Sequence, residues 1–232
     1  MQAHAPHPPE PLSRELLLIG GGHSHVAVVR AFGMRPVPGL RVTVVSRDVH
    51  TPYSGMLPGL VAGHYGFDDC HIDLRPLCEA NGVRLINGEV EALDPARQTA
   101  RIAGRETLRY DWASINIGSR PALGGIAGAA GHGTSVKPID RFLAHWLRLL
   151  EELRASPRPC RLLVVGGGAA GVEIALACAW RAREALGAHA ALFRVGIVNA
   201  APVLLPSHNA RVRRYFHREL ERRGIELHAH AR

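Results

Sequence analysis

Hydrophobic and polar positions follow a pattern that occurs twice along the chain. Apolar runs at 15–19 and 41–46 predict two buried strands, and the stretch between them, from about 24 to 32, predicts a helix. The same order returns with a strand and turn at 161–168, a helix at 169–186 and a strand at 193–199. Because a strand, a helix and a parallel strand form one βαβ unit, the sequence predicts an α/β fold built on two such units.

The segments around these two units carry weaker patterns. Residues 47–59 are rich in proline and glycine and predict an irregular loop, whereas residues 72–82 predict a short helix and 83–93 a third strand. The other predicted elements are antiparallel strands at 98–104 and 106–118, helices at roughly 139–154 and 209–224, and a strand that starts at 225. We therefore expect a flexible tail at 1–14, a first domain at 15–155 and a second domain at 156–232.

Composition places the chain among ordinary globular proteins. Its 232 residues are long enough to bury a large core, and 47% are hydrophobic while 21% are charged, which excludes a disordered protein. The formal net charge is +8, carried almost entirely by arginine because Lys137 is the single lysine. A basic surface attracts nucleic acid, anionic lipid or a phosphate-bearing cofactor. No basic run is interleaved with aromatic residues, so nucleic acid is not an expected partner.

Cysteine usage and hydropathy indicate a cytoplasmic protein. The four cysteines form no CxxC pair and no metal-like cluster, which favours reduced thiols. Residues 162–180 are apolar enough to imitate a membrane span, but Glu173 at their centre argues against one. The paired histidines at 23 and 25 and at 228 and 230 lack further ligands, so no metal site is predicted.

The helix predicted at 209–224 is amphipathic. Its apolar face carries Val212, Phe216 and Leu220, and arginines cover the other side. Such a helix either packs on its own sheet or lies on an anionic membrane. We favour packing on the sheet, and expect no membrane contact from this part of the chain.

The glycine turn after the strand at 161–165 has the spacing of a dinucleotide-binding site. Gly166, Gly168 and Gly171 complete GxGxxG between a strand and a long helix. A diphosphate must approach the backbone amides at the start of that helix, where the macrodipole is positive, and side chains on the turn would hold it away. This turn therefore predicts nucleotide binding.

The first glycine turn departs from that spacing. Gly20 and Gly22 are present, but His25 stands where the third glycine belongs, and we expect it to push the helix outward or to lie along its edge. The alternative is a plain strand–helix junction that uses glycine for positive φ. The second strand of each unit ends in an uncharged residue, Ser46 or Asn199, that can still hydrogen-bond a ribose hydroxyl.

Several segments together resemble a known group of flavoproteins. "YDWASINIGSRP" at 110–121 resembles a segment that the two-dinucleotide-binding-domain FAD/NAD(P)-dependent pyridine nucleotide-disulfide oxidoreductases place before their second glycine turn, with Asn116, Ile117 and Gly118 in place of Ala-Thr-Gly. "GGGHSHV", "VSRDVHTPYSGMLPG" and "HIDLRPL" are similar to the type II NADH dehydrogenase-like subgroup, including the form fused to selenide, water dikinase. The resemblance implies two Rossmann-like FAD/NAD(P)-binding domains, the second inserted in the first and here truncated.

The resemblance also implies a role for individual residues. For the FAD diphosphate it implies a site made by Gly20, Gly21, Gly22 and His23. For the adenosine of FAD it implies Ser46, Arg47 and Val90. For the flavin side it implies Tyr53, Ser54, Ile117 and Gly118. For NAD(P)H it implies Gly166, Gly168, Gly171, Glu173 and Asn199. NADH is favoured because no arginine directly follows Asn199 to meet a 2′-phosphate.

The expected function is that of an FAD-dependent oxidoreductase. Hydride would pass from NAD(P)H to flavin and electrons then to a small-molecule acceptor such as a quinone, with no catalytic side chain required. The disulfide-active cysteine pair of thiol-disulfide members is missing, which disfavours disulfide reduction. Members of the group continue well beyond the position of Arg232, so we expect a fused C-terminal portion or a partner chain to complete the enzyme. The alternative is a truncated nucleotide-binding module without catalysis.

Overall fold

The computed structural model describes residues 14–119, 121, 126 and 128–231. The chain divides into two compact units, one made of residues 1–53 and 71–119 and the other of residues 54–70 and 120–232. The predicted tail at 1–14 lies outside the described residues apart from Arg14, with which the first strand begins.

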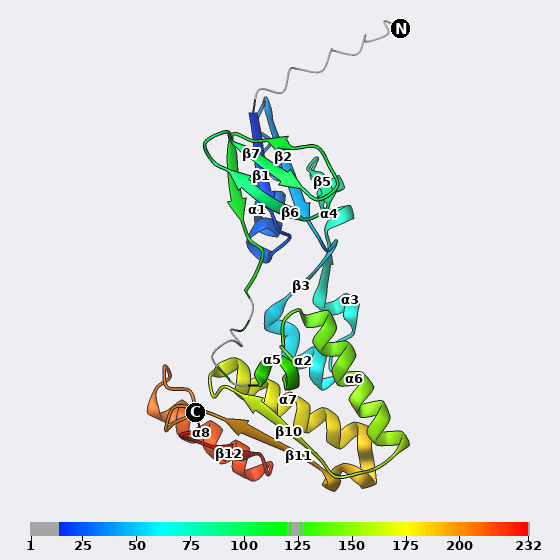
Figure 1. Ribbon diagram of the computed structural model, residues 1–232, viewed down its shortest axis with the longest axis vertical. Coiled ribbons are helices and arrows are strands. Elements are labelled where there is room, and N and C mark those ends of the chain that lie inside the picture. The colour runs from blue at the N-terminus through cyan, green and yellow to red at the C-terminus, as the bar shows by residue number, and fades with distance from the viewer. Residues whose placement is uncertain (1–13, 120, 122–125, 127, 232) are drawn as a thin grey trace, which may run out of the picture. The chain divides into compact units, whose positions relative to one another are not determined.

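A parallel sheet forms the centre of the first unit (Figure 1). Its strand order is β5-β2-β1-β9, and the strands are β1 (Arg14–Ile19), β2 (Leu40–Ser46), β5 (Arg84–Asn87) and β9 (Trp112–Ile115). Helix α1 (His23–Met34) connects β1 to β2, which completes the first predicted βαβ unit. All three strand pairs are parallel, so the carboxyl ends of these strands meet at one edge of the sheet.

Both faces of this sheet are covered. On one face, Leu18 and Val44 pack with Val29 of α1 and with Leu74 of α4 (Leu74–Ala80). On the other face, Leu17 and its neighbours pack against an antiparallel meander of β6 (Val90–Asp94), β7 (Thr99–Ile102) and β8 (Leu108–Arg109). Alternate residues of β1 are therefore buried on opposite sides of the sheet.

The second unit repeats the strand–helix–strand arrangement. Its parallel sheet has the order β10-β11-β12, with β10 (Cys160–Val165), β11 (Phe193–Val198) and β12 (Glu226–His228). Helix α7 (Ala169–Leu186) and a 3-10 helix (Gly187–Leu192) connect β10 to β11, and α8 (Ala210–Arg222) leads to β12. Figure 1 shows α7 running beside β10 and β11. The α/β fold with two parallel βαβ units is confirmed.

Further helices belong to the second unit. They are α2 (Leu57–Ala62), α3 (Phe67–Cys70), α5 (Ala129–His132) and α6 (Ile139–Ala155), and of these α2, α3 and α6 contribute to its core. Trp146 of α6 is buried and donates its indole N–H to the Val61 carbonyl oxygen at 3.2 Å. Val212 and Phe216 of α8 pack against this core and Leu220 is buried in it, as predicted for a helix that covers its own sheet.

Three local predictions were wrong. Residues 47–59 are not irregular: they contain β3 (His50–Pro52), a 3-10 helix (Ser54–Met56) and the start of α2, and β3 pairs with β4 (His71–Asp73). The run at 83–93 is two strands separated at Gly88. The run at 106–118 also divides, and β9 joins the parallel sheet beside β1 because its register is set by that neighbour rather than by the hairpin.

Candidate functional site

The first glycine turn connects β1 to α1. Gly20 has φ +91° and donates its N–H to the Val45 carbonyl oxygen at 2.8 Å, which holds the turn against β2. The N-cap of α1 is Gly22, which has no side chain with which to cap the helix. The N–H groups of His23 and Ser24 meet no acceptor among the described residues. This helix start can therefore bind an anion.

The second glycine turn has the same construction. Gly166 has φ +115° and donates to the Val198 carbonyl oxygen at 2.8 Å, and Gly168 is the uncapped N-cap of α7. The N–H groups of Ala169 and Ala170 likewise meet no acceptor in the described part of the chain. The two turns thus present the same backbone donors at the carboxyl edge of two separate parallel sheets.

Space around the second turn agrees with its glycine spacing. A Cβ atom on Gly171 would lie 1.9 Å from the Gly166 carbonyl oxygen, so only glycine allows α7 to pack this closely on the strand. A Cβ on Gly168 would meet none of the described residues within 4 Å. The face of Gly168 is open, as the approach of a diphosphate requires.

His25 takes the place of the third glycine in a different way from the predicted one. Its side chain is buried beneath the turn, with 2% of its surface exposed, and does not lie along the exposed edge of α1. Nδ1 lies 2.7 Å from the Gly20 carbonyl oxygen, and Nε2 lies 2.9 Å from the Ser114 hydroxyl oxygen on β9. Because a carbonyl oxygen only accepts, Nδ1 carries a proton and donates it. The imidazole fits under the turn because these two bonds satisfy its buried polar atoms.

The residues at the ends of the second strands hold the loops that follow them. Ser46 donates its hydroxyl to the Asp48 carbonyl oxygen at 2.7 Å. Asn199 accepts from the Gly167 N–H at 3.2 Å and donates to the carbonyl oxygens of Ala201 and Val203, each at 2.9 Å. Both side chains are buried, and the Asn199 amide uses its two donors within the chain.

Two predicted residues meet beside the first turn. The rings of His23, in the first turn of α1, and Tyr53, directly after β3, have centroids 4.5 Å apart.

The segment that follows β9 also reaches the first turn. A Cβ on Gly20 would lie 2.3 Å from the Asn116 carbonyl oxygen and 3.0 Å from the Ile117 Cα. Ile117 is 73% exposed, and Gly118 has φ +75°.

The remaining predicted residues lie in other surroundings. Arg47 is exposed and pairs with Asp48 at 3.0 Å. Val90 begins β6 and packs on the meander side of the sheet. Ser54 begins a 3-10 helix that belongs to the second compact unit, and Glu173 is exposed on α7.

Sequence reasoning missed two polar residues near the first turn. Ser114 binds His25, and Asn116 lies against Gly22, where a Cβ would come within 2.4 to 2.6 Å of the Asn116 side-chain amide. The only sequence signal for Asn116 is its polarity in a segment where the resembled proteins have alanine. The bonding partner of His25 is distant in the sequence, so no local pattern identifies it.

The thiols of the chain are poor nucleophiles at neutral pH. Burial raises the pKa of Cys78 to about 11 and that of Cys178 to about 12, so both stay protonated. All four cysteines are free. Among the described residues, no group of three His, Cys, Asp or Glu side chains is placed to hold a metal ion.

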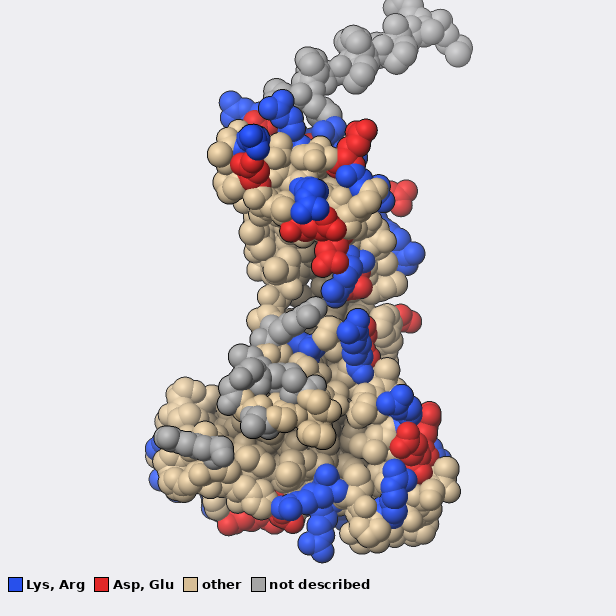
Figure 2. Space-filling view, viewed as in Figure 1, with Lys and Arg blue, Asp and Glu red and all other residues tan. Residues whose placement is uncertain are grey.

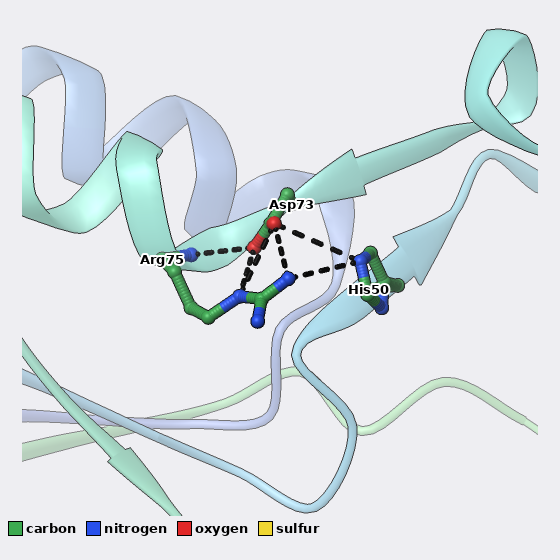
Figure 3. Close-up of polar contacts among 3 residues, drawn as sticks. All are labelled: His50, Asp73 and Arg75. Atoms are coloured by element: carbon green, nitrogen blue, oxygen red, sulfur yellow. Dashed lines mark hydrogen bonds and ion pairs between the residues drawn. The ribbon is translucent and has the colours of Figure 1, made fainter.

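A polar cluster joins the β3–β4 ribbon to α4 (Figure 3). Asp73 is the N-cap of α4: it accepts from the Arg75 N–H at 2.9 Å, and its carboxylate pairs with the Arg75 guanidinium at 2.7 Å. His50 Nε2 lies 3.7 Å from the same carboxylate. The hydrogen bonds from Arg75 lower the pKa of Asp73 to about 2. The cluster fixes the start of α4.

Charge on the surface is mixed in sign. Figure 2 shows basic and acidic side chains interspersed on the face in view, in keeping with ion pairs such as Arg101–Glu91 and Arg148–Glu152. Of the helices in the described ranges, none is long and apolar enough to cross a membrane.

Known proteins share this arrangement. The chain is 28% identical over 157 residues to the sulfide-quinone reductase of Aquifex aeolicus, a match that covers 67% of this chain and 36% of that protein. It is 25% identical over 167 residues to the NADH dehydrogenase-like protein YutJ of Bacillus subtilis, which covers 70% of this chain and 44% of that protein. The match therefore spans less than half the length of these curated relatives.

Solved structures show the same fold. The sulfide:quinone oxidoreductase of Aquifex aeolicus superposes with a TM-score of 0.75 at 22% identity, covering 94% of this chain and 51% of that one. NDH2 from Plasmodium falciparum, solved in complex with NADH, superposes with a TM-score of 0.78 at 16% identity, covering 93% of this chain and 48% of that one.

A family profile matches nearly all of the described chain. The profile of the pyridine nucleotide-disulphide oxidoreductases covers residues 14–232, which include both glycine turns and both parallel sheets. The chain belongs to the pyridine nucleotide-disulphide oxidoreductase family.

Proposed function

We propose that this chain is the nucleotide-binding part of an FAD-dependent oxidoreductase that takes hydride from NAD(P)H. FAD is assigned to the turn at Gly20–Gly22 and NAD(P)H to the turn at Gly166–Gly171. When bound, these cofactors supply the redox chemistry: the nicotinamide gives up hydride and the flavin passes electrons on. The acceptor proposed is a small molecule such as a quinone, because a relative is named a sulfide-quinone reductase.

One observation carries the proposal, the repetition of an uncapped helix start behind a glycine turn. Gly22 and Gly168 are both N-caps without a side-chain cap, at the carboxyl ends of β1 and β10. Ligands of open α/β sheets bind at that edge, and a dinucleotide diphosphate fits free amides at a helix start. We call each glycine turn with the helix start behind it a cradle, the first at Gly20–Gly22 and the second at Gly166–Gly168. A protein that binds one nucleotide needs one cradle, whereas a protein that passes hydride between two cofactors needs two.

The other residues would hold the nucleosides and the ring systems. In the first unit, the tilted rings of His23 and Tyr53 lie against each other beside the proposed diphosphate position, and Ser46 orders the loop that would border the adenosine. In the second unit, Gly167 and Asn199 tie the turn to the loop at 201–203, which gives the adenosine ribose a fixed neighbour.

NADH is the proposed nicotinamide cofactor. A 2′-phosphate is usually recognised by an arginine near the end of the second strand. Asn199 is followed by Ala200 and Ala201, and its own two amide donors are used within the chain. Titration with NADH and NADPH should give tighter binding for NADH.

Flavin absorbance tests the proposal. The 232-residue chain is incubated with FAD, freed of excess cofactor and titrated with NADH without oxygen. Retained flavin gives a yellow protein, and bleaching by NADH shows that the two cofactors communicate. A colourless protein that takes up neither FAD nor NADH would contradict the proposal, and one that binds NADH or FAD without bleaching would favour a non-catalytic nucleotide-binding module.

A further inference from the structure

The two cradles differ at the second glycine of the turn. In the described part of the chain, a Cβ on Gly168 would meet no atom within 4 Å, whereas a Cβ on Gly22 would lie 2.4 Å from Oδ1 and 2.6 Å from Nδ2 of Asn116. The second glycine is the position at which the backbone approaches a bound diphosphate. In the first cradle, a side-chain amide therefore occupies the place that is open in the second.

The backbone on either side fixes that amide at the turn. Asn116 donates its N–H to the Ile19 carbonyl oxygen at 2.8 Å, and its carbonyl oxygen accepts from the Gly22 N–H at 3.3 Å. These two bonds tie the end of β9 to the end of β1 and to the N-cap of α1. The Asn116 side chain starts from this fixed backbone and lies beside the helix start.

The side-chain amide of Asn116 differs from those of other asparagines in its hydrogen bonding. The side-chain nitrogen and oxygen of the half-buried Asn116 make no hydrogen bond to any described residue, whereas Asn199, Asn87 and Asn81 each donate to backbone carbonyl oxygens. An asparagine amide offers two N–H donors and can rotate to present them. Within the ranges that the structure describes, the neighbouring N–H groups of His23 and Ser24 are also without acceptors.

We propose that Asn116 is a ligand of the FAD diphosphate, donating a hydrogen bond from Nδ2 to a phosphate oxygen alongside the α1 backbone amides. The proposal rests on the proposed function of the first turn as an FAD site. A hydrogen bond to a charged oxygen is among the stronger hydrogen bonds. The Gly22 N–H already donates to the Asn116 carbonyl oxygen, so the Asn116 side chain would supply the phosphate with a donor in its place.

Two substitutions at this position separate a ligand from a filler of space. Asn116→Ala removes the donor and opens the face of Gly22, and should weaken FAD binding about 10- to 100-fold. Asn116→Asp keeps the shape but adds a negative charge next to the diphosphate, and should weaken binding further than alanine does. Asn81→Ala is the matched control, since Asn81 lies in the same unit and donates to the Leu77 carbonyl oxygen instead.

The experiment is an equilibrium titration of each purified chain with FAD, followed by flavin fluorescence, with thermal unfolding recorded to confirm that each variant folds. A titration of the same samples with NADH reports on the second cradle, which none of the substitutions touches. The proposal predicts weaker FAD binding for both Asn116 variants, in the order alanine then aspartate, with unchanged NADH binding and an unchanged Asn81→Ala control.

Other results overturn it in distinguishable ways. If the parent binds FAD and Asn116→Ala binds it equally or more tightly, Asn116 only fills space, and the function of the first turn stands. If the parent fails to bind FAD and Asn116→Ala gains binding, the side chain is a plug and the ligand role is wrong. If neither chain binds FAD while both bind NADH, the FAD assignment of the first turn fails and the role of Asn116 fails with it.

Discussion

The two βαβ units carry different residues at the third position of the glycine turn. In each, the third position of the turn lies next to the carbonyl oxygen of the first glycine. In the second unit that position is Gly171, where a Cβ would lie only 1.9 Å from the Gly166 carbonyl oxygen, so glycine alone leaves room for this oxygen. In the first unit it is His25, whose Nδ1 donates to the Gly20 oxygen at 2.7 Å. A glycine turn thus tolerates a large residue here when the residue bonds to the carbonyl that would otherwise exclude it.

The units also differ in how their sheets are covered. Leu17 and Leu163 hold equivalent places, three residues before Gly20 and Gly166, yet Leu17 is 0% exposed and Leu163 is 45% exposed. The β6–β8 meander packs over Leu17. In the second unit, Val165 on the same face as Leu163 is 63% exposed. Equivalent strands can therefore carry equivalent sequences and still contribute unequally to stability.

Substitution of these two leucines gives the largest contrast. Leu17→Ala removes a fully buried side chain and should lower the free energy of unfolding by about 2–5 kcal/mol, whereas Leu163→Ala should change it by about 0.5 kcal/mol. Denaturant unfolding of both variants measures the difference. Equal losses would show that the face of β10 is as well covered in solution as that of β1.

Replacement of the close-packed glycine comes next. In Gly171→Ala the new Cβ would clash with the backbone oxygen of Gly166, so α7 must shift, which should cost about 1–3 kcal/mol of stability. NADH affinity should fall because the amides at the helix start move with it, and calorimetric titration measures that fall. FAD binding to the first unit serves as the internal control. Parent-like NADH binding would contradict the close packing.

His25→Ala probes the corresponding position of the first unit. It leaves the Gly20 carbonyl oxygen and the Ser114 hydroxyl without their partner and should destabilise the chain by about 1–3 kcal/mol. Ser114→Ala removes one of the two bonds and should cost less. Thermal unfolding of both variants provides the measurement, and a larger effect of Ser114→Ala would argue against the assigned bonds.

The smallest expected effect concerns Asp73. Its pKa in the folded chain is about 2, below its ordinary value of 3.8, so the ionised carboxylate stabilises the fold above about pH 4 and this contribution is lost as the pH falls towards 2. Asp73→Asn should therefore lower the melting temperature slightly near neutral pH, and this difference from the parent should shrink steadily as the pH falls from about 4 to 2. A difference that stays constant over this range would contradict the ion pair with Arg75.

Periodicity predicted the parts of the fold that are governed by one buried face. The strands β1, β2, β10 and β11 and the helices α1, α6, α7 and α8 lie where the apolar pattern predicts them. Periodicity failed where contacts with distant strands decide the pairing. The sequence predicted an antiparallel hairpin partner for β9, but β9 pairs in parallel with β1. Short elements in 47–59 were hidden by proline and glycine, since Pro58 lies in the first turn of α2, where proline is tolerated.

The sequence predicted the glycine turns of the candidate site, but not the side chains that His25 and Gly22 contact. The first two glycines of the spacing describe backbone geometry, which local sequence dictates, and in both turns the first has positive φ and the second is the helix N-cap. The bond between His25 and Ser114 joins residues that are distant in the chain, as does the contact of Asn116 with Gly22. Only the pairing of β9 with β1 brings these residues together.

Simultaneous titration with both cofactors tests the central claim most directly. The chain is saturated with FAD and then titrated calorimetrically with NADH, and the order is reversed in a second experiment. Separate cradles at Gly20 and Gly166 predict one FAD and one NADH bound per chain, with neither displacing the other. Displacement of one by the other, or binding of a single nucleotide in total, would contradict the account.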